Sequence, residues 1–272
     1  MNALHPAAVL RRSAQAIRHA PVLRHCAPVW DRLRGSYVRA LAALGQRRGV
    51  PVRVGGYSIR LAPDVVNASW ESIEEVSYRA FAAEIRRGAV VFDVGAHFGT
   101  YTMIAARRGG SSARVVAYEP SALTREYLGR HLRWNGIERQ VIVRPVCCGS
   151  SVGETRFFTR PGVPDGSNGI LPADGLLETS SPVTRIDEET RWLHLAPDVI
   201  KIDVEGAELD VLEGAERTLA TGRPRLFVSV HPRQLARRHL TPDAVVGWLH
   251  ERSYRCELIA EDQELHFLAR AA

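Results

Sequence analysis

Ionisable side chains follow four apolar segments of this 272-residue sequence, at the point where each segment ends. They are Asp93 near the end of 89–94, Glu119 after 114–118, Asp203 and Glu205 within 199–206, and His231 at the end of 226–231. If these segments are parallel strands of one sheet, their carboxyl ends meet at the edge where open α/β sheets bind ligands. Four such positions together indicate a binding or catalytic site.

The turn after the first of these segments contains two glycines, in the run DVGAHFG at 93–99. Gly95 permits a tight turn, and Gly99 permits close packing of the helix that we expect next. His97 stands where a GxGxxG dinucleotide loop has its middle glycine, and Asp93 would repel a phosphate but accept a hydrogen bond from an ammonium group. Because a helix N-terminus also favours a carboxylate, the loop suits a ligand that carries both amino and carboxylate groups.

Glu119 ends the next strand, 24 residues beyond Gly95. A carboxylate at this position can accept hydrogen bonds from both hydroxyls of a ribose. An amino acid joined to a ribose describes S-adenosylmethionine, which is therefore the predicted cofactor. The alternative is that Glu119 is a solvated acid at a helix start, stabilised by the helix dipole.

Lys201 is the only lysine of the chain and lies in the strand expected at 199–204. Side chains alternate along a strand, so Lys201, Asp203 and Glu205 share one face. Because isolated buried charges are costly, Lys201 should pair with Asp203 or Asp93. The trio either serves chemistry or forms a buried ion pair that only stabilises the sheet.

His231 ends the following strand, and an imidazole that titrates near neutral pH suits a general base. It is the predicted proton acceptor, with Asp203 orienting or replacing it, although a lone histidine before proline is often an ordinary strand-end residue. A metal-assisted variant with Asp203, Glu205 and His231 is the second choice, because Lys201 competes for those carboxylates. No metal is therefore assigned.

Strands and helices alternate from residue 89 onward, after a hairpin signal at 52–61 and a helical pattern at 69–87. Further strands are expected at 114–118, 141–148, 199–204 and 226–231, and helices at 100–108, 121–134, 207–220 and from 242. A polar excursion covers 150–197 with Phe157, Phe158 and Ile186 as anchors, and 255–259 and 265–269 form a terminal hairpin joined by an acidic turn. Strands separated by helices predict an α/β fold with a doubly wound, mostly parallel sheet.

Five segments of the chain resemble FkbM-type methyltransferases, a branch of the class I superfamily that uses S-adenosylmethionine. They are VVFDVGAHFGTYT (90–102), VVAYEP (115–120), CCGSSVGETRFF (147–158), VIKIDVEGAELDVLEGAERTL (199–219) and FVSVHP (227–232). The resemblance implies a seven-stranded Rossmann-like sheet and methyl transfer, usually to a hydroxyl. The resemblance implies that Asp93, Gly95, Gly99 and Glu119 bind the cofactor. With the rest of the strand-end segments, the predicted cofactor residues are Asp93, Gly95, Ala96, His97, Gly99, Thr102, Glu119 and Cys148, and the catalytic residues, predicted from their positions at the strand ends, are His231, Asp203, Glu205 and Lys201. His97 stands where the family usually has Asn.

Most of the basic charge lies at the N-terminus. Residues 1–50 hold nine Arg and one Asp, whereas the whole chain has a net charge of +6, so the remainder is slightly acidic. We expect an Arg-rich arm at 1–50 and a methyltransferase domain at 51–272, with its hairpin and helix at 51–88 and its Rossmann-like core at 89–272. The arm is either solvated or docks on an anionic membrane surface or an acidic partner, and no nucleic-acid motif is present. Four cysteines without a paired spacing, and no secretory signal, favour a cytoplasmic setting.

The sequence thus predicts an O-methyltransferase that acts on a small-molecule or glycan hydroxyl, with sugars, polyketides, lipids and peptides all open as acceptors. Two alternatives remain. One is a nicotinamide oxidoreductase on the same type of sheet, although the GxGxxG loop is absent. The other is a non-catalytic binding module that acts through the basic arm. The oligomeric state cannot be read from the sequence.

Overall fold

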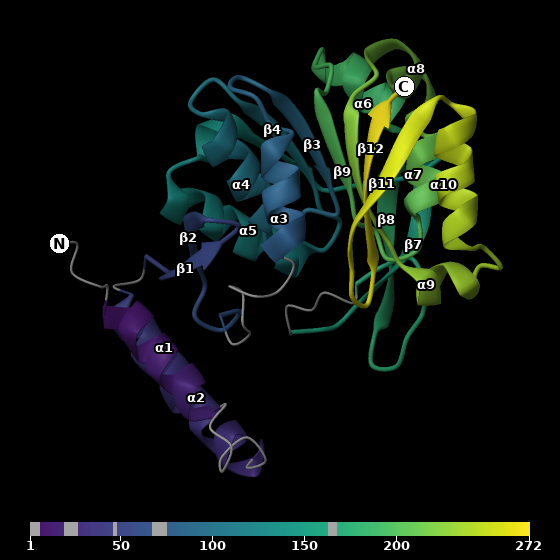
Figure 1. The fold of residues 1–272 in the computed structure, drawn as a ribbon. Helices are drawn as coiled ribbons and strands as arrows, with labels where there is room; N and C mark the ends of the chain where they lie inside the picture. Colours follow the sequence, from purple (N-terminus) through teal and green to yellow (C-terminus); the bar gives the residue numbers. More distant parts are fainter. Residues whose placement is uncertain (1–5, 19–26, 46–47, 67–74, 163–167) are drawn as a thin grey trace.

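The computed structural model describes residues 6–18, 27–45, 48–66, 75–162 and 168–272. Its centre is a seven-stranded sheet in the order β11-β12-β10-β9-β3-β4-β5 (Figure 1). The strands are β3 (Val90–Val94), β4 (Arg114–Tyr118), β5 (Val141–Arg144), β9 (Val199–Ile202), β10 (Arg225–Val230), β11 (Tyr254–Glu261) and β12 (Leu265–Ala271). Strand β12 runs opposite to the other six strands and pairs antiparallel with β10 and β11. The doubly wound sheet with a terminal hairpin is confirmed, and β9 lies beside β3 at its middle.

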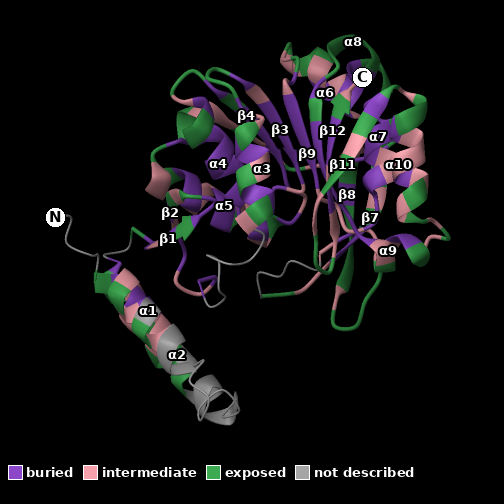
Figure 2. Cartoon of the chain, in the orientation of Figure 1, coloured by how far each residue is buried: buried purple, intermediate pink, exposed green. Residues whose placement is uncertain are grey.

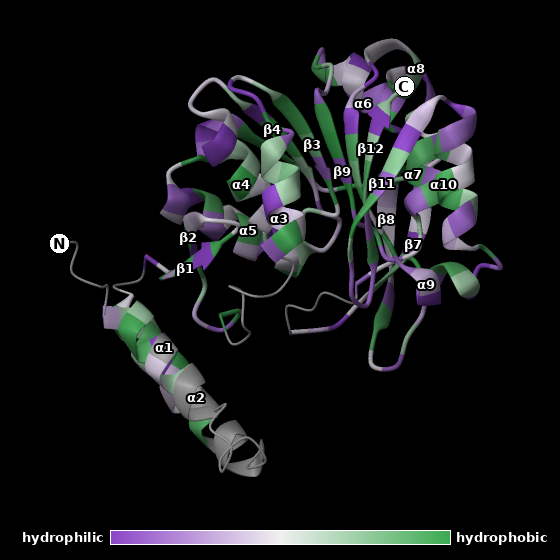
Figure 3. Cartoon of the chain, in the orientation of Figure 1, coloured by the Kyte–Doolittle hydropathy of each residue, from purple (hydrophilic) through white to green (hydrophobic). Residues whose placement is uncertain are grey.

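Helices cover both faces of this sheet. One face carries α3 (Glu75–Ala83), α4 (Thr100–Gly109) and α5 (Ala122–Asn135). The other face carries α6 (Ile186–Leu193), α7 (Glu208–Glu213), α8 (Glu216–Gly222) and α10 (Pro242–Glu251). A short 3-10 helix, η1 (Glu138–Gln140), follows α5. Alternate residues of each strand face opposite layers, so Phe227 joins the first core and Leu226 the second. The central strands are buried and apolar (Figures 2 and 3). Because unpaired polar groups are costly to bury, we expect the polar side chains of a site at the ends of these strands.

The segment after β5 differs from the prediction of one strand over 141–148. Pro145, which lacks a backbone N–H, follows β5, and β6 (Cys147–Cys148) instead pairs with β8 (Leu177–Thr184). Together with β7 (Gly153–Thr159) they form a separate three-stranded sheet, order β6-β8-β7. The excursion at 150–197 therefore contains two strands and α6 that the polar sequence did not reveal. Its expected anchors Phe157, Phe158 and Ile186 are buried, as predicted.

Three further elements have different bounds from those expected. β9 ends at Ile202, two residues early, and the single helix over 207–220 is two helices separated at Gly214 and Ala215. The helix over 69–87 is described as α3 only, which ends at Ala83; residues 69–74 lie outside the described part of the chain. A short helix, α9 (Pro232–Ala236), follows β10 and was not expected. These changes place Asp203, Glu205 and His231 on loops just beyond the strand ends.

The predicted N-terminal hairpin is present as β1 (Val50–Val54) and β2 (Tyr57–Leu61). It is joined to α5, where His131 Nε2 accepts from Ala62 N at 2.9 Å and Asn135 Oδ1 accepts from Arg60 N at 3.0 Å. Helices α1 (Pro6–Arg18) and α2 (Ala27–Leu44) lie side by side and project from the body (Figure 1). Ala7 and Leu41 nevertheless belong to the core cluster that contains the hairpin. None of the described helices is long and apolar enough to cross a membrane.

Candidate active site

A cavity of about 230 Å³ opens at the carboxyl ends of β3, β4 and β9. Six of the predicted site residues line it: Gly95, His97, Glu119, Cys148, Asp203 and Glu205. The other six, which are Asp93, Ala96, Gly99, Thr102, Lys201 and His231, do not line it. The strand ends thus meet as expected, and the predicted set divides into residues on the cavity surface and residues behind it.

The glycine loop has the backbone that its sequence requires. Gly95 has a φ of 77°, and a Cβ there would overlap the carbonyl oxygen of Asp203, so only glycine fits between the two loops. Gly99 has a φ of 85°, and a Cβ there would overlap Leu128 of α5. His97 also has a left-handed φ, 49°, a conformation in which Asn and His are both enriched. The replacement of Asn by His at this position therefore preserves the path of the loop.

Asp93 is fully buried behind this loop. Its Oδ2 accepts a hydrogen bond from Thr102 Oγ1 at 2.5 Å, and its Oδ1 lies 3.4 Å from Lys201 Nζ. Both neighbours belong to the protein, so the structure does not expose Asp93 to a ligand ammonium group as the sequence suggested. The hydrogen bond from Thr102 to Asp93 instead joins the first turn of α4 to the end of β3.

Lys201 joins the two loops that meet at the cavity. Its Nζ donates to the Gly95 carbonyl oxygen at 2.8 Å and lies 3.3 Å from Asp203 Oδ2. The sequence predicted that Lys201 pairs with Asp203 or Asp93, and the structure shows that it contacts both. Burial alone would raise the pKa of Asp203, but the charges of Lys201 and His231 hold it below its usual value.

Glu119 lies on the cavity wall with only 5% of its surface exposed. Its two oxygens accept from the backbone N–H groups of His97 and Ser121, each at 2.9 Å. Burial raises the pKa of Glu119 to about 7, against the opposing effect of those two hydrogen bonds. Each carboxylate oxygen can accept a further hydrogen bond, so the group suits a pair of hydroxyls.

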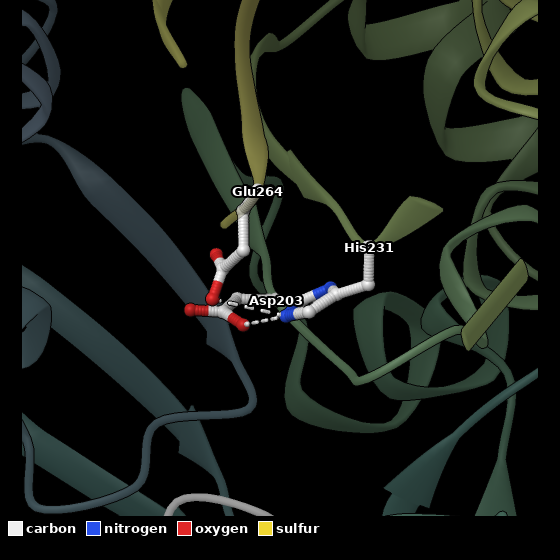
Figure 4. Close-up of side chains that lie close together, drawn as sticks. All are labelled: Asp203, His231 and Glu264. Atoms are coloured by element: carbon white, nitrogen blue, oxygen red, sulfur yellow. Dashed lines mark ion pairs between the residues drawn. The ribbon is translucent and has the colours of Figure 1, made fainter. Parts of the chain in front are cut away.

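His231 lies at the centre of a group of acidic side chains (Figure 4). Its Nδ1 is 2.7 Å from Glu208 Oε1, and its Nε2 faces Glu264 Oε1 at 3.2 Å, Asp203 Oδ1 at 3.6 Å and Glu205 Oε1 at 3.7 Å. Burial alone would lower the pKa of His231, but contacts with Glu208 and Glu264 and the charges of Asp203 and Glu205 raise it to about 12. The surrounding carboxylates thus favour the protonated ring when no cation is bound, and the ring is 2% exposed. Neither property suits a group that must accept a proton from a ligand.

Two of these carboxylates were not among the predicted site residues. Glu208 is fully buried at the start of α7, although it lies within the KIDVEGAE segment that carries the family resemblance. Glu264 lies between β11 and β12, in the acidic turn noted in the sequence, and the hairpin brings it to the end of β10. Only the antiparallel pairing of β12 with β10 places it there.

Glu205 and the two adjacent cysteines complete the site. Glu205 has a left-handed φ of 53°, a strained conformation for a non-glycine residue. It accepts from Gln234 Nε2 at 2.6 Å, and burial raises its pKa to about 7. Burial raises the pKa of Cys147 to about 11 and that of Cys148 well above its usual value. The cysteines are therefore neutral packed thiols and not nucleophiles.

The sheet order and the strand-end site define the doubly wound α/β fold of class I methyltransferases. The family model described as the methyltransferase FkbM domain matches residues 93–256. The chain belongs to this FkbM methyltransferase family. The family assignment supports neither a nicotinamide oxidoreductase nor a non-catalytic binding module.

Individual relatives are distant. The hexuronic acid methyltransferase AglP of Haloferax volcanii is 27% identical over 172 residues, which cover 61% of this chain and 68% of AglP. The solved structure of methyltransferase FkbM from Methylobacillus flagellatus is 17% identical with a TM-score of 0.49, covering 76% of this chain and 60% of that one. A SAM-dependent O-methyltransferase from Thermotoga maritima is 15% identical with a TM-score of 0.48, covering 82% and 78%.

Proposed function

We propose that this protein uses S-adenosylmethionine to methylate a hydroxyl group of a small-molecule or glycan acceptor. The observation that carries the proposal is a single cavity, lined by two sets of residues, at the strand-end edge of a methyltransferase fold. The first set, Gly95, His97 and Glu119, marks the first end, which we assign to the cofactor; the second set, Asp203, Glu205 and Glu264, marks the end that we assign to the acceptor. Donor and acceptor would thus meet within one cavity.

The residues at the first end fit this cofactor. Glu119 retains acceptor capacity for the two ribose hydroxyls, and the start of α4 after Gly99 favours a carboxylate. The apolar side chains of Val146, Phe157 and Ile170 line the same cavity and suit a purine base. When bound, S-adenosylmethionine would supply an electrophilic methyl group.

The acceptor hydroxyl must lose its proton as its oxygen gains the methyl group. Glu205 is the proposed proton acceptor, because its carboxylate lines the cavity, whereas His231 is shielded from it by three carboxylates. Asp203 is the alternative, although its Oδ2 lies beside Lys201. Alignment of the hydroxyl with the methyl group should supply most of the acceleration, since methyl transfer needs an in-line geometry.

The acceptor class is tested directly. A sugar hydroxyl is the first candidate, because AglP is named as a hexuronic acid methyltransferase; polyketides and lipids are the others. The purified protein would be incubated with methyl-labelled S-adenosylmethionine and a metabolite extract of its host, and new labelled products would be identified by mass spectrometry. We expect a labelled methyl ether that is absent with Glu205→Gln. A protein that binds no S-adenosylhomocysteine in calorimetry would disprove the proposal.

A further inference from the structure

We propose that Asp203, His231 and Glu264 form a binding site for a divalent cation at the acceptor end of the cavity (Figure 4). One ligand atom from each residue lies within 4.8 Å of the others. Asp203 comes from the loop after β9, His231 from the end of β10 and Glu264 from the turn between β11 and β12. Three separate loops thus bring two carboxylates and one imidazole together.

His231 is oriented as a metal-binding histidine would be. Its Nδ1 faces Glu208 Oε1 at 2.7 Å, and that same oxygen accepts from Gly206 N at 2.9 Å, which holds the carboxylate in position. Histidines that bind metals usually donate their other ring N–H to such a carboxylate. The opposite nitrogen, Nε2, is buried, makes no hydrogen bond of normal geometry within the described chain, and points at Asp203 and Glu264.

Lys201 contacts Asp203, as expected from the sequence, but it occupies only one of the two carboxylate oxygens. Its Nζ lies on the Oδ2 side of Asp203, whereas His231 Nε2 faces Oδ1. Lys201 also donates to the carbonyl oxygen of Gly95, which draws it toward the cofactor loop. One oxygen of Asp203 therefore remains available to a cation.

The two separations that involve His231 are close to those expected for a six-coordinate ion. Two ligand atoms bound at right angles about 2.1 Å from an ion lie about 3 Å apart. His231 Nε2 lies 3.2 Å from Glu264 Oε1 and 3.6 Å from Asp203 Oδ1, so small side-chain movements would close the shell. Two carboxylates with one imidazole favour Mn²⁺ or Mg²⁺, with water or substrate at the remaining positions.

A cation would also balance the charge of this region. Glu205 adds a third carboxylate within 3.7 Å of His231 Nε2, and the buried Glu208 lies on the other side of the ring. Like charges this close repel unless a cation or protons lie between them. Asp203 and Glu264 both line the cavity, so an ion bound there would be open to a ligand.

The chemical role of the ion rests on the proposed function. A divalent cation would bind the acceptor oxygen and lower the pKa of its hydroxyl, while the carboxylate of Glu205 takes the proton. His231 would then be a ligand of the ion and not the general base. Binding of the ion itself does not depend on that role.

The test is titration of the full-length, chelator-treated protein with MnCl₂, in which the EPR signal of free Mn²⁺ reports binding. We expect one Mn²⁺ per chain, displaced by Mg²⁺. His231→Ala and Glu264→Gln should each weaken binding at least about tenfold, and Glu208→Gln by about 10–100-fold. Glu261→Gln, which changes an exposed residue of the same hairpin, is the matched control and should bind normally.

Two results would overturn the proposal: no Mn²⁺ binding by the wild type, or equal binding by Glu264→Gln and Glu261→Gln. Calorimetry with S-adenosylhomocysteine on the same samples checks that each variant is folded. It also separates the two proposals. A wild type that binds Mn²⁺ but no S-adenosylhomocysteine would refute only the methyltransferase proposal. A wild type that binds S-adenosylhomocysteine but no Mn²⁺ would refute only the cation site.

Discussion

The pH dependence of cofactor binding should follow the ionisation of Glu119. Burial raises the pKa of this carboxyl to about 7, so it changes charge within the physiological range. Ribose hydroxyls donate hydrogen bonds, and the ionised carboxylate is the better acceptor. If only the ionised form binds well, affinity for S-adenosylhomocysteine should fall by about tenfold from pH 8 to pH 6, because about nine-tenths of the groups are ionised at the first pH and about one-tenth at the second.

Glu119→Gln removes the charge with little change in size. Its amide nitrogen would face one of the two backbone donors, His97 N or Ser121 N, so one donor loses its partner. Loss of charge-assisted hydrogen bonds worth about 1.5–3 kcal/mol predicts a decrease in affinity of about 10- to 150-fold at pH 8. At pH 6 the difference from the wild type should be much smaller, because the wild-type carboxyl is then mostly protonated.

Calorimetric titration with S-adenosylhomocysteine at pH 6, 7 and 8 measures both effects. Glu126→Gln, which changes an exposed residue of the helix α5 that follows Glu119, is the control and should keep the wild-type pH dependence. A wild-type affinity that does not change with pH, together with unchanged binding by Glu119→Gln at pH 8, would refute the assignment of Glu119 to the ribose.

Other predictions concern stability, chemistry and the arm. Because the pKa of Glu119 is raised in the folded protein, the free energy of unfolding of the ligand-free wild type should fall by up to about 3 kcal/mol as the pH rises from 4.5 to 7. Urea unfolding of Glu119→Gln should not show this decrease. Glu205→Gln should lower turnover by about 10²–10⁴-fold with unchanged S-adenosylhomocysteine affinity, and a normal rate would exclude it as the base. Gly95→Ala should unfold or lose the cofactor, as thermal melts and calorimetry would report, since its φ is positive and the Asp203 carbonyl fills the space. Deletion of residues 1–44 should lower the melting temperature, because Ala7 and Leu41 are buried in the core. It should leave the affinity for S-adenosylhomocysteine unchanged, and loss of that binding would make the arm part of the site.

The sequence predicted the part of the site that follows from strand direction. Parallel strands place their carboxyl ends together, so Glu119, Asp203 and the glycine loop could be brought to one edge from the alternation of elements alone. The cost of isolated buried charge predicted that Lys201 pairs with Asp203 or Asp93, and only the structure shows that it contacts both. The sequence could not show that Asp93 is covered by Thr102, because burial at a strand end depends on how the next helix packs.

The acidic group around His231 depends on contacts between distant segments. Glu264 reaches it only because the last strand is antiparallel and turns at the end of β10. Glu208 reaches it from a helix that the sequence pattern joined to α8. The role of a general base was predicted for a histidine considered alone, and nothing in the sequence indicated that its ring contacts four carboxylates.

The position of Lys201 implies communication between the two halves of the cavity. Its ammonium group contacts the carbonyl of the cofactor loop and a carboxylate of the acceptor end, so a ligand that moves either loop changes the contacts of the other. Donor and acceptor binding should then be cooperative, and the coupling must be the same in both directions. Replacement of Lys201 by methionine would remove that connection, and each ligand would bind with an affinity independent of its partner.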